Sequence, residues 1–264
     1  MRQNETSETK LNWQKIGSGP NLILLHGWGM NGAVWQQTAE RLSHHFCVHI
    51  VDLPGFGFSY QAGFSSMDEL VQPLLDEAPQ QAIWLGWSLG GLVTTHVALH
   101  APERINGLIT VASSPCFAEQ KPWRGIQPKV LSAFTTQLMD DFHLTIERFI
   151  ALQAMGSPSA RQDLKTLKQA VLSRPSPNPQ ALLAGLTLLA NLDYREYLTT
   201  IQAPTLRLYG RLDGLVPIQV ERDMAALMPN SQSYVFSQSS HAPFMTEPDE
   251  FCQQVTEFAR LHSM

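Results

Sequence analysis

A serine between glycines, in the order Gly-Trp-Ser-Leu-Gly at positions 86–90, constrains this chain more than any other feature. The apolar run 82–85 before it predicts a short buried strand, and the run 91–99 after it predicts a helix. A sharp turn between strand and helix exposes the serine hydroxyl at the helix N-terminus, where backbone N–H groups favour negative charge. The glycines two residues before and after Ser88 keep side chains out of this crowded turn. The pattern predicts that Ser88 is a nucleophile.

Strands and helices alternate along most of the chain, which predicts an α/β fold with a mostly parallel central sheet flanked by helices. The expected strands cover residues 22–25, 46–51, 82–85, 105–112, 206–210 and 233–236. The expected helices outside the middle of the chain cover 34–42, 67–78, 91–99 and 249–262, with an interruption near Pro73. In such sheets ligands bind at the carboxyl ends of the strands, so the residues that follow strands are the candidates for chemistry.

The stretch 117–190 interrupts this alternation, because it contains no expected strand. It predicts helices over 130–139, 142–155, 160–172 and 180–189, with a proline-rich link at 174–179. A helical insertion between two strands of a sheet is most simply a lid over the strand ends. We therefore divide the chain into a core, 1–116 and 191–264, and a helical lid, 117–190.

The charge of the chain is divided at the same borders. The lid holds eight Lys and Arg residues and five Asp and Glu residues, a net charge of +3, whereas the rest of the chain carries −8. This division suggests an acidic partner or substrate at the lid, although ordinary solvated helix faces explain it nearly as well. The total charge of −5 argues against a nucleic-acid partner.

Composition also argues against other classes of protein. No apolar run approaches the ~18 residues of a membrane span, and the polar residues 1–12 predict no secretory leader. The three cysteines, Cys47, Cys116 and Cys252, lie far apart and have no metal-ligand spacing. We expect them to be small buried side chains in a protein of the reducing cytoplasm, and we expect no metal site.

A serine hydroxyl becomes a strong nucleophile only when a histidine takes its proton and a carboxylate holds that histidine. On this scaffold the acid follows the serine, the histidine comes last, and each stands after a strand. Asp213 and His241 have this order, and each comes just after an expected strand. Asp193 and Asp223 are the other downstream acids, but one precedes its strand and the other falls in the following helix. The predicted triad is therefore Ser88, Asp213 and His241.

The tetrahedral intermediate of ester hydrolysis needs hydrogen-bond donors for its oxyanion. We expect one from the backbone N–H of Leu89, directly after the nucleophile. The other should come from the glycine-rich turn after the strand 22–25, where we choose the backbone N–H of Trp28. His26 opens the same turn, and we expect it to hold the turn by hydrogen bonds.

These residues together resemble the α/β-hydrolase superfamily over essentially the whole chain, which implies an α/β-hydrolase fold with a helical lid insertion. The resemblance rests on the runs 26–29, 52–57 and 86–91, with Asp213 and His241. A closer resemblance, to the carboxylesterase family of biotin synthesis, rests on the runs 84–93, 111–117, 206–210, 212–217 and 241–244. The tryptophan before the nucleophile and the Ser-Ser-Pro-Cys-Phe run at the start of the lid are its most specific features.

The closer resemblance implies hydrolysis of the methyl ester of pimeloyl-acyl-carrier protein to pimeloyl-acyl-carrier protein and methanol, without a cofactor or a metal. The expected partner is thus an acyl-carrier protein, with no nucleic acid and no membrane, and a monomer is expected. The acyl chain would lie between sheet and lid. The implied substrate-binding residues are Trp28, Ser88, Leu89, Phe149, Ile150, Ala151, Leu152, Gln153 and His241.

Acyl-carrier proteins are acidic, so the positive lid is the expected docking surface. Arg161, Lys165 and Lys168 have the spacing of one helix face, and Arg148 lies on the preceding helix. The family pattern has a further basic residue one turn before Arg148, where this chain has Leu144. This departure predicts weaker or shifted docking.

Two other functions fit the same residues. A general short-chain carboxylesterase would share the triad, because specificity depends on the shape of the pocket. A ligand receptor on the same fold would turn over very slowly. Preference for carrier-protein substrates separates the first alternative from the proposed reaction, and the turnover number separates the second.

Overall fold

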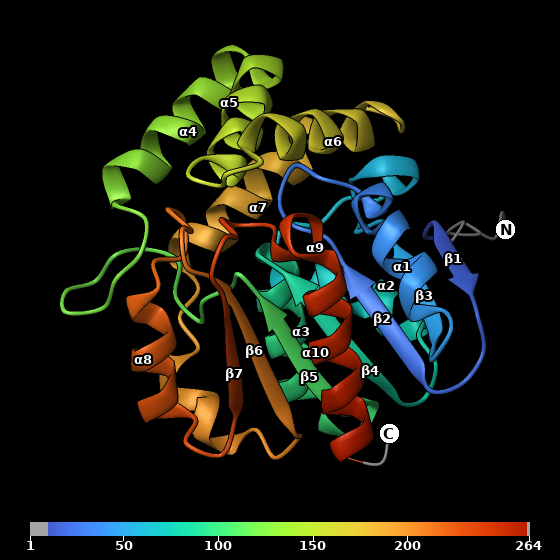
Figure 1. Ribbon diagram of the computed structural model, residues 1–264. Helices are drawn as coiled ribbons and strands as arrows, with labels where there is room; N and C mark the ends of the chain where they lie inside the picture. The colour runs from blue at the N-terminus through green and yellow to red at the C-terminus, as the bar shows by residue number, and fades with distance from the viewer. Residues whose placement is uncertain (1–9, 263–264) are drawn as a thin grey trace, which may run out of the picture.

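The computed structural model describes residues 10–262, so residues 1–9, on which most of the expectation about a leader rests, lie outside the described residues. Its centre is a seven-stranded sheet in the order β1-β3-β2-β4-β5-β6-β7 (Figure 1). Only the β1–β3 pair is antiparallel. The strands are β1 (Trp13–Ile16), β2 (Asn21–Leu25), β3 (Cys47–Val51), β4 (Ala82–Trp87), β5 (Ile105–Val111), β6 (Thr205–Gly210) and β7 (Gln232–Phe236). The expected fold is confirmed, and β1 is an additional edge strand that no expected element covers.

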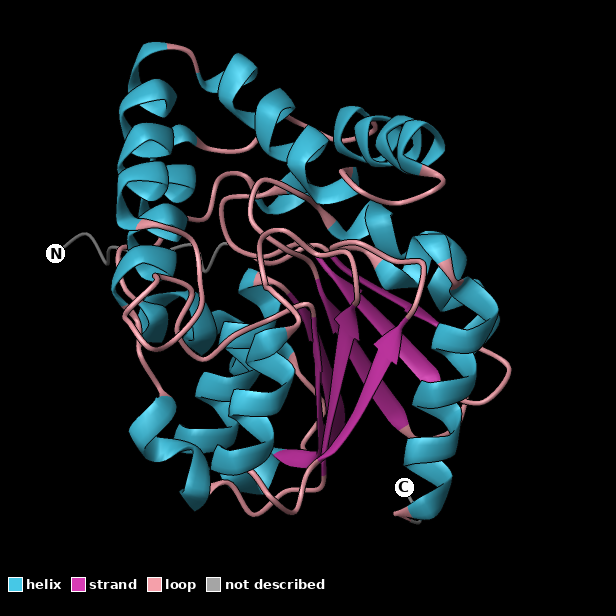
Figure 2. Cartoon of the chain, turned by 60° about the vertical axis from the view of Figure 1, so that its left-hand side comes forward, coloured by secondary structure: helices cyan, strands magenta, loops and turns pink. Residues whose placement is uncertain are grey.

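Helices cover both faces of the sheet (Figures 1 and 2). On one face α1 (Gln36–Leu42) contacts α10 (Pro248–Leu261), and on the other α2 (Met67–Glu77) contacts α3 (Leu89–His100). Outside the lid, the chain also contains the helices α8 (Gln219–Leu227) and α9 (Pro243–Thr246). Its short 3₁₀ helices are η1 (Gly32–Trp35), η2 (Gly57–Ser59), η3 (Pro102–Arg104) and η4 (Arg195–Thr200).

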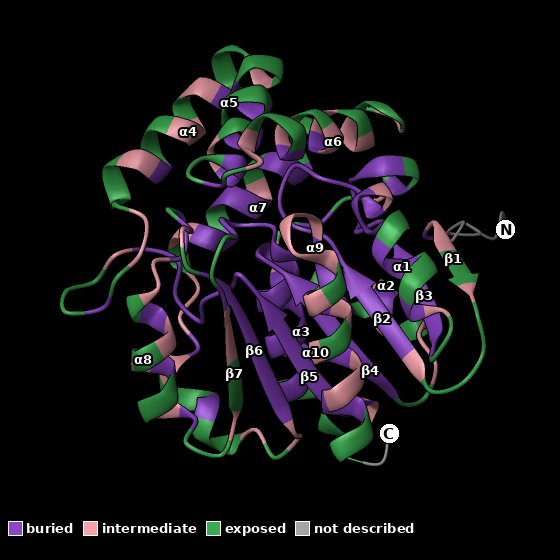
Figure 3. Ribbon diagram, viewed as in Figure 1, coloured by how far each residue is buried: buried purple, intermediate pink, exposed green. Residues whose placement is uncertain are grey.

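The strand β4 and the helix α3 lie in the middle of the hydrophobic core. All six residues of β4 are buried, as are all residues of α3 except its last two. Figure 3 shows the central strands buried along their length, while exposed residues lie on the outer surfaces of the helices. Strands covered on both faces are continuous apolar runs, which is the pattern that β4 shows. The turn between β4 and α3, which holds Ser88, is therefore fixed by the burial of both elements.

The expected interruption at Pro73 is wrong, because α2 continues through this residue. The helix begins at a cap in which Ser66 Oγ accepts a hydrogen bond from Glu69 N at 3.2 Å. A proline inside a helix costs about 3 kcal/mol. The side chains of Leu70 and Leu74 on either side of it are fully buried, and their packing outweighs that cost.

Four helices between β5 and β6 stand above the carboxyl ends of the strands (Figure 1). They are α4 (Pro128–Asp140), α5 (Phe142–Ala154), α6 (Ala160–Leu172) and α7 (Pro179–Asn191), and each end lies within two residues of the expected one. The preceding stretch 117–127 is irregular. We retain 117–190 as the proposed limits of the lid. In the described part of the chain, no helix is long and apolar enough to cross a membrane.

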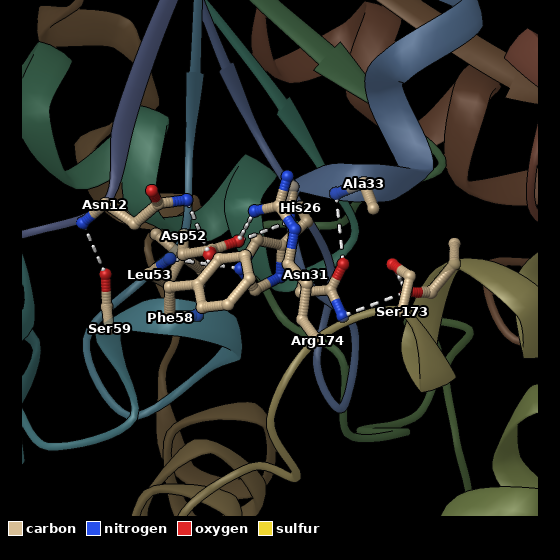
Figure 4. Close-up of polar contacts among 12 residues, drawn as sticks. Asn12, His26, Asn31, Ala33, Asp52, Leu53, Phe58, Ser59, Ser173 and Arg174 are labelled. Carbon is tan, nitrogen blue, oxygen red and sulfur yellow. Dashed lines mark hydrogen bonds and ion pairs between the residues drawn. The ribbon is translucent and has the colours of Figure 1, made fainter.

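A buried carboxylate joins the lid to the core (Figure 4). Asp52, after β3, is fully buried, and its Oδ1 accepts hydrogen bonds from Gly32 N at 2.7 Å and Arg174 Nη1 at 2.5 Å. Its Oδ2 accepts hydrogen bonds from Asn12 Nδ2 at 2.9 Å and Phe58 N at 2.8 Å. Arg174 lies in the link between α6 and α7, and only 6% of its side chain is exposed. The ion pair thus fixes the link to the core.

We expect the Arg174→Met variant to lose about 3–5 kcal/mol of unfolding free energy, because it leaves the Asp52 carboxylate buried and without its cation. Urea denaturation measures this loss. The matched control is Arg41→Met, because Arg41 pairs with Asp249 at the surface, where the two side chains are 46% and 87% exposed. That variant should lose less than about 1 kcal/mol. Equal losses in the two variants would contradict the role of the buried pair.

Candidate active site

Ser88 lies in the turn between β4 and α3 with φ 55° and ψ −116°. A positive φ at a residue other than glycine costs about 1–3 kcal/mol and persists only where the surroundings enforce it. A Cβ on Gly86 would lie 2.0 Å from Gly90 O, and one on Gly90 would lie 2.6 Å from Leu25 O, so both positions require glycine. Ser88 N donates to Val111 O at 2.9 Å, which ties the turn to the end of β5.

Asp213 and His241 are brought together from the loops after β6 and β7. His241 Nδ1 lies 2.7 Å from Asp213 Oδ2, and each side chain is 1% exposed. Asp213 Oδ1 accepts hydrogen bonds from Leu215 N at 2.8 Å and Val216 N at 3.0 Å, so both carboxylate oxygens are held. The contact with the carboxylate selects the neutral ring that carries its proton on Nδ1. The other ring nitrogen, Nε2, is then an acceptor.

The second ring nitrogen of His241 is free, and the imidazole packs against Trp87, next to the nucleophile in the chain. Among residues 10–262, His241 Nε2 has no hydrogen-bond partner although it is buried, and no bond joins it to Ser88. Trp87, the residue before Ser88, has its ring 5.8 Å from the imidazole and donates from Nε1 to His241 O at 2.7 Å. Hydrogen bonds between a nucleophile and its base often become short only when substrate is bound. The arrangement can therefore support proton transfer from Ser88.

The glycine-rich turn after β2 lies against the nucleophile. A Cβ on Gly27 would be 3.2 Å from Ser88 Cβ. Leu89 is the first residue of α3, and the first N–H groups of a helix have no partner within it. Within the described residues, the backbone N–H groups of Leu89 and Trp28 form no hydrogen bond. The choice of these two donors for an oxyanion stays a prediction.

His26 holds this turn through both of its ring nitrogens, as expected. Leu53 N donates to His26 Nε2 at 3.0 Å, so Nε2 is an acceptor and the proton is on Nδ1. Nδ1 then donates to Gly27 O at 2.8 Å. Burial lowers the pKa of His26 to about 4, which keeps the ring neutral near pH 7. With both nitrogens occupied, His26 cannot act as the base.

The two alternative acids form other contacts. Asp193 Oδ2 pairs with Arg195 Nη2 at 2.5 Å, and hydrogen bonding from Arg195 holds the pKa of Asp193 below its usual range. Asp223, in α8, lines a surface groove together with Asp193 and Trp123. Of the three candidate acids, Asp213 alone contacts His241 in the described part of the chain.

Trp28 joins the turn after β2 to the lid. Its side chain is fully buried and donates from Nε1 to Leu182 O in α7 at 2.8 Å. Its ring meets that of Phe149 in α5 edge to face, with centroids 4.7 Å apart. A Cβ on Gly185 would lie 2.6 Å from Trp28 Cδ1, so α7 needs glycine here to approach the tryptophan.

A narrow apolar cavity of about 10 Å³ lies between Ser88 and the lid. It is lined by Ser88, Phe117, Ile126, Leu131, Phe134, Phe149, Leu186, Leu189 and Leu215. Apart from Ser88, only Phe149 was expected from the sequence. For the four lining residues on α4 and α7, the available signal was an apolar spacing of three residues within each helix.

Of the expected substrate-binding run 149–153, only Phe149 lines this cavity, and the role of the other four residues stays a prediction. Ile150 lines a separate cavity between α5, α6 and the link to α7. Ala151 is exposed and Leu152 is half-buried, and neither lines the cavity at Ser88. Successive residues of a helix point about 100° apart, so these five side chains point in different directions.

Gln153 lies one turn after Phe149, on the same face of α5, and does not line this cavity either. It is 1% exposed, and its backbone oxygen accepts a hydrogen bond from His241 N at 3.2 Å. Neither polar atom of its side-chain amide has a partner among the described residues. Buried polar atoms are normally paired, so this amide is an exception among the buried side chains of α5.

The four expected docking residues do not form one uniform face. Arg148 in α5 and Arg161 and Lys165 in α6 are exposed. Lys168 Nζ instead lies 3.4 Å from Glu147 Oε1 of α5, which reduces its net contribution to the potential of the lid. The candidate basic surface therefore rests on the first three residues.

Comparison with known proteins identifies similar chains over nearly the full length. Residues 20–248 match the family model described as alpha/beta hydrolase fold. The chain is 66% identical to a pimeloyl-[acyl-carrier protein] methyl ester esterase of Vibrio parahaemolyticus, over 96% of this chain and 99% of that protein. It is 66% identical to the protein of the same name from Vibrio cholerae, over 94% and 98%. An esterase from Exiguobacterium antarcticum has a similar structure, with a TM-score of 0.83, 19% identity and 95% of each chain covered.

Proposed function

The chain belongs to the α/β-hydrolase family, and we propose that it hydrolyses the methyl ester of pimeloyl-acyl-carrier protein to pimeloyl-acyl-carrier protein and methanol. One observation carries the proposed chemistry: the paired Asp213 and His241, with a free Nε2, are held against Trp87, the residue before a serine in a strained turn. The names of the curated relatives support the substrate. The enzyme is then a serine carboxylesterase.

In the first half of the reaction, Ser88 Oγ attacks the carbonyl carbon of the methyl ester while His241 Nε2 takes the hydroxyl proton. Asp213 stabilises the imidazolium that forms. The N–H groups of Leu89 and Trp28 hold the negative oxygen of the tetrahedral intermediate. The bond to the methoxy oxygen then breaks, the imidazolium protonates that oxygen, and methanol leaves an acyl-enzyme on Ser88.

In the second half, water takes the place of methanol. His241 Nε2 removes a proton from the water as it attacks the acyl carbon, and the same two N–H groups hold the second oxyanion. The intermediate expels Ser88 Oγ, which recovers its proton from the imidazolium. The product is a free carboxylate at the end of the acyl chain, and no step requires a metal or a cofactor.

The substrate carries apolar methylene groups between its methyl ester and the thioester that joins it to the carrier. The apolar cavity beneath the lid suits these methylenes, with the ester at Ser88 and the thioester toward the lid. The free amide of Gln153 suits a polar group near His241. Because the cavity is narrow, we propose that the lid helices move apart to admit the acyl chain.

Arg148, Arg161 and Lys165 are our proposed docking residues for the acidic carrier protein, with Lys168 as a weaker contributor because of its pairing with Glu147. Leu144, which is 43% exposed, offers an apolar contact at the edge of this surface instead of a charge. The catalytic unit is proposed as a monomer. A reducing cytoplasm is proposed as its location, which suits the three free cysteines.

Reversing two of these charges tests the docking surface. We expect Arg161→Glu/Lys165→Glu to raise KM for the carrier-protein ester at least about tenfold, because each change replaces attraction to an acidic partner by repulsion. The rate on p-nitrophenyl butyrate should be unchanged. Lys129→Glu is the matched control, since Lys129 is an exposed lid residue at the start of α4. An equal rise in KM in the control would show that general charge, and not this surface, determines binding.

A further inference from the structure

The loop that carries His241 is held from two sides. On the core side Trp87 Nε1 donates to His241 O at 2.7 Å, and the ring of Phe244 lies 5.0 Å from that of Trp87. On the lid side, His241 N donates to Gln153 O at 3.2 Å and Ser240 Oγ donates to Met155 O at 2.9 Å. The lid therefore contacts the main chain of the expected base directly.

A third contact with the lid lies at the end of α9, which begins two residues after His241. Thr246 Oγ1 donates to Asp163 Oδ2 in α6 at 3.0 Å. Within α9, the N–H groups of Met245 and Thr246 both donate to Ala242 O, at 3.0 and 3.3 Å. These bonds make 242–246 one compact turn, so a displacement of Thr246 is transmitted to the residue next to His241.

Asp163 is held by hydroxyl groups instead of a cation. It is 6% exposed, and it accepts hydrogen bonds from Ser157 Oγ at 2.9 Å and Ser159 Oγ at 2.9 and 3.0 Å, in addition to Thr246. No cationic side chain among residues 10–262 lies within ion-pair distance of it. A buried carboxylate is costly unless its oxygens are hydrogen-bonded, so the loss of one of these few donors is consequential.

The helix that presents Asp163 inward also presents Arg161 and Lys165 to solvent. We propose that Asp163 and Thr246 are positioning residues for His241, and that their hydrogen bond seats the catalytic loop on the helix that receives the carrier protein. This inference rests on the proposed function, in which His241 is the base. Through this contact, the position of the base depends on the position of α6.

Replacing the donor tests the inference. We expect Thr246→Val to lower kcat for p-nitrophenyl butyrate about 10- to 100-fold with KM changed less than about twofold, because a base displaced by a fraction of an ångström slows chemistry and not binding. Thr246→Ser keeps the hydroxyl and should restore kcat to within about threefold. The matched control is Thr166→Val, because Thr166 Oγ1 donates only to Gln162 O within α6. It should behave as wild type.

Reaction of Ser88 with a fluorophosphonate gives a second measurement, which does not depend on ester binding or on the folded fraction. Its rate constant should fall in Thr246→Val by the same factor as kcat, because both reactions need His241 to accept the serine proton. The double variant Asp163→Asn/Thr246→Val should be no slower than the slower single variant, since both substitutions act on the same hydrogen bond between Thr246 and Asp163.

Three results would overturn the inference: a Thr246→Val variant with wild-type kcat and labelling rate, a raised KM with unchanged kcat, or additive losses in the double variant. Each would leave the proposed function intact if wild type and Thr166→Val hydrolyse the carrier-protein ester. A wild-type protein that neither hydrolyses the esters nor reacts with the fluorophosphonate would overturn both proposals.

Discussion

The Ser88→Ala variant is expected to lose turnover of pimeloyl-acyl-carrier-protein methyl ester by about 10⁵- to 10⁶-fold, because no other group in the site can form the acyl-enzyme. The methanol-release burst should disappear together with steady-state turnover. The fold should be retained, since alanine can occupy the same strained backbone position and the Ser88 hydroxyl forms no hydrogen bond within the described residues. A thermal melt and a single-turnover methanol assay measure the two effects.

Ser43→Ala is the control for this variant, because Ser43 is a surface residue at the end of α1 whose Oγ donates to Glu40 O. It should have wild-type turnover. Turnover in Ser88→Ala above a thousandth of wild type would contradict a serine nucleophile at this position. It would favour a mechanism in which water attacks the ester directly.

The Asp213→Asn variant is expected to lose about 10⁴-fold in kcat, because the asparagine would hold His241 in the wrong tautomer. The oxygen that accepts from Leu215 N and Val216 N would keep these two bonds, so the new NH₂ group would face His241 Nδ1. Nδ1 then becomes an acceptor, and the ring proton moves to Nε2. A protonated Nε2 cannot take the proton of Ser88.

Asp193→Asn provides the comparison for this effect. Asp193 is one of the two alternative acids that the sequence offers, and its carboxylate pairs with Arg195. We expect its kcat to stay within about threefold of wild type, since it has no contact with the reacting atoms. A larger loss of kcat in Asp193→Asn than in Asp213→Asn would show that Asp193, and not Asp213, is the acid of the triad.

The chemistry-bearing positions could be predicted because their signals are local or follow from topology. The glycines around Ser88 are required by contacts within a single turn, such as the 2.0 Å approach of a Gly86 Cβ to Gly90 O. Asp213 and His241 could be placed because a parallel sheet brings the ends of β6 and β7 to one edge. Their mutual contact at 2.7 Å agrees with the order of residues along the chain.

The packing of the lid could not be predicted in the same way. Of the five residues 149–153 expected to bind the substrate, the helical geometry of α5 turns only Phe149 toward the cavity at Ser88. The pair of Asp52 and Arg174 joins residues 122 positions apart, and no local pattern indicates it. Lys168 has the spacing of a docking face, yet it pairs with Glu147 on the neighbouring helix. In each case the deciding contact comes from another element of the fold.

The three candidate functions differ in what the same triad would turn over. A general esterase should prefer small activated esters, and a receptor should release product very slowly. The positive lid favours a substrate delivered by an acidic carrier, because a small ester would not need this feature.

The most direct measurement is the rate at which the wild-type protein releases methanol from pimeloyl-acyl-carrier-protein methyl ester, compared with its rate on p-nitrophenyl butyrate and with Ser88→Ala. The proposed function predicts serine-dependent release with a kcat/KM at least about tenfold above that for the small ester, since docking on the lid adds binding energy that the small ester lacks. Slow release from the carrier-protein ester, together with fast hydrolysis of p-nitrophenyl butyrate, would contradict it and identify a general esterase.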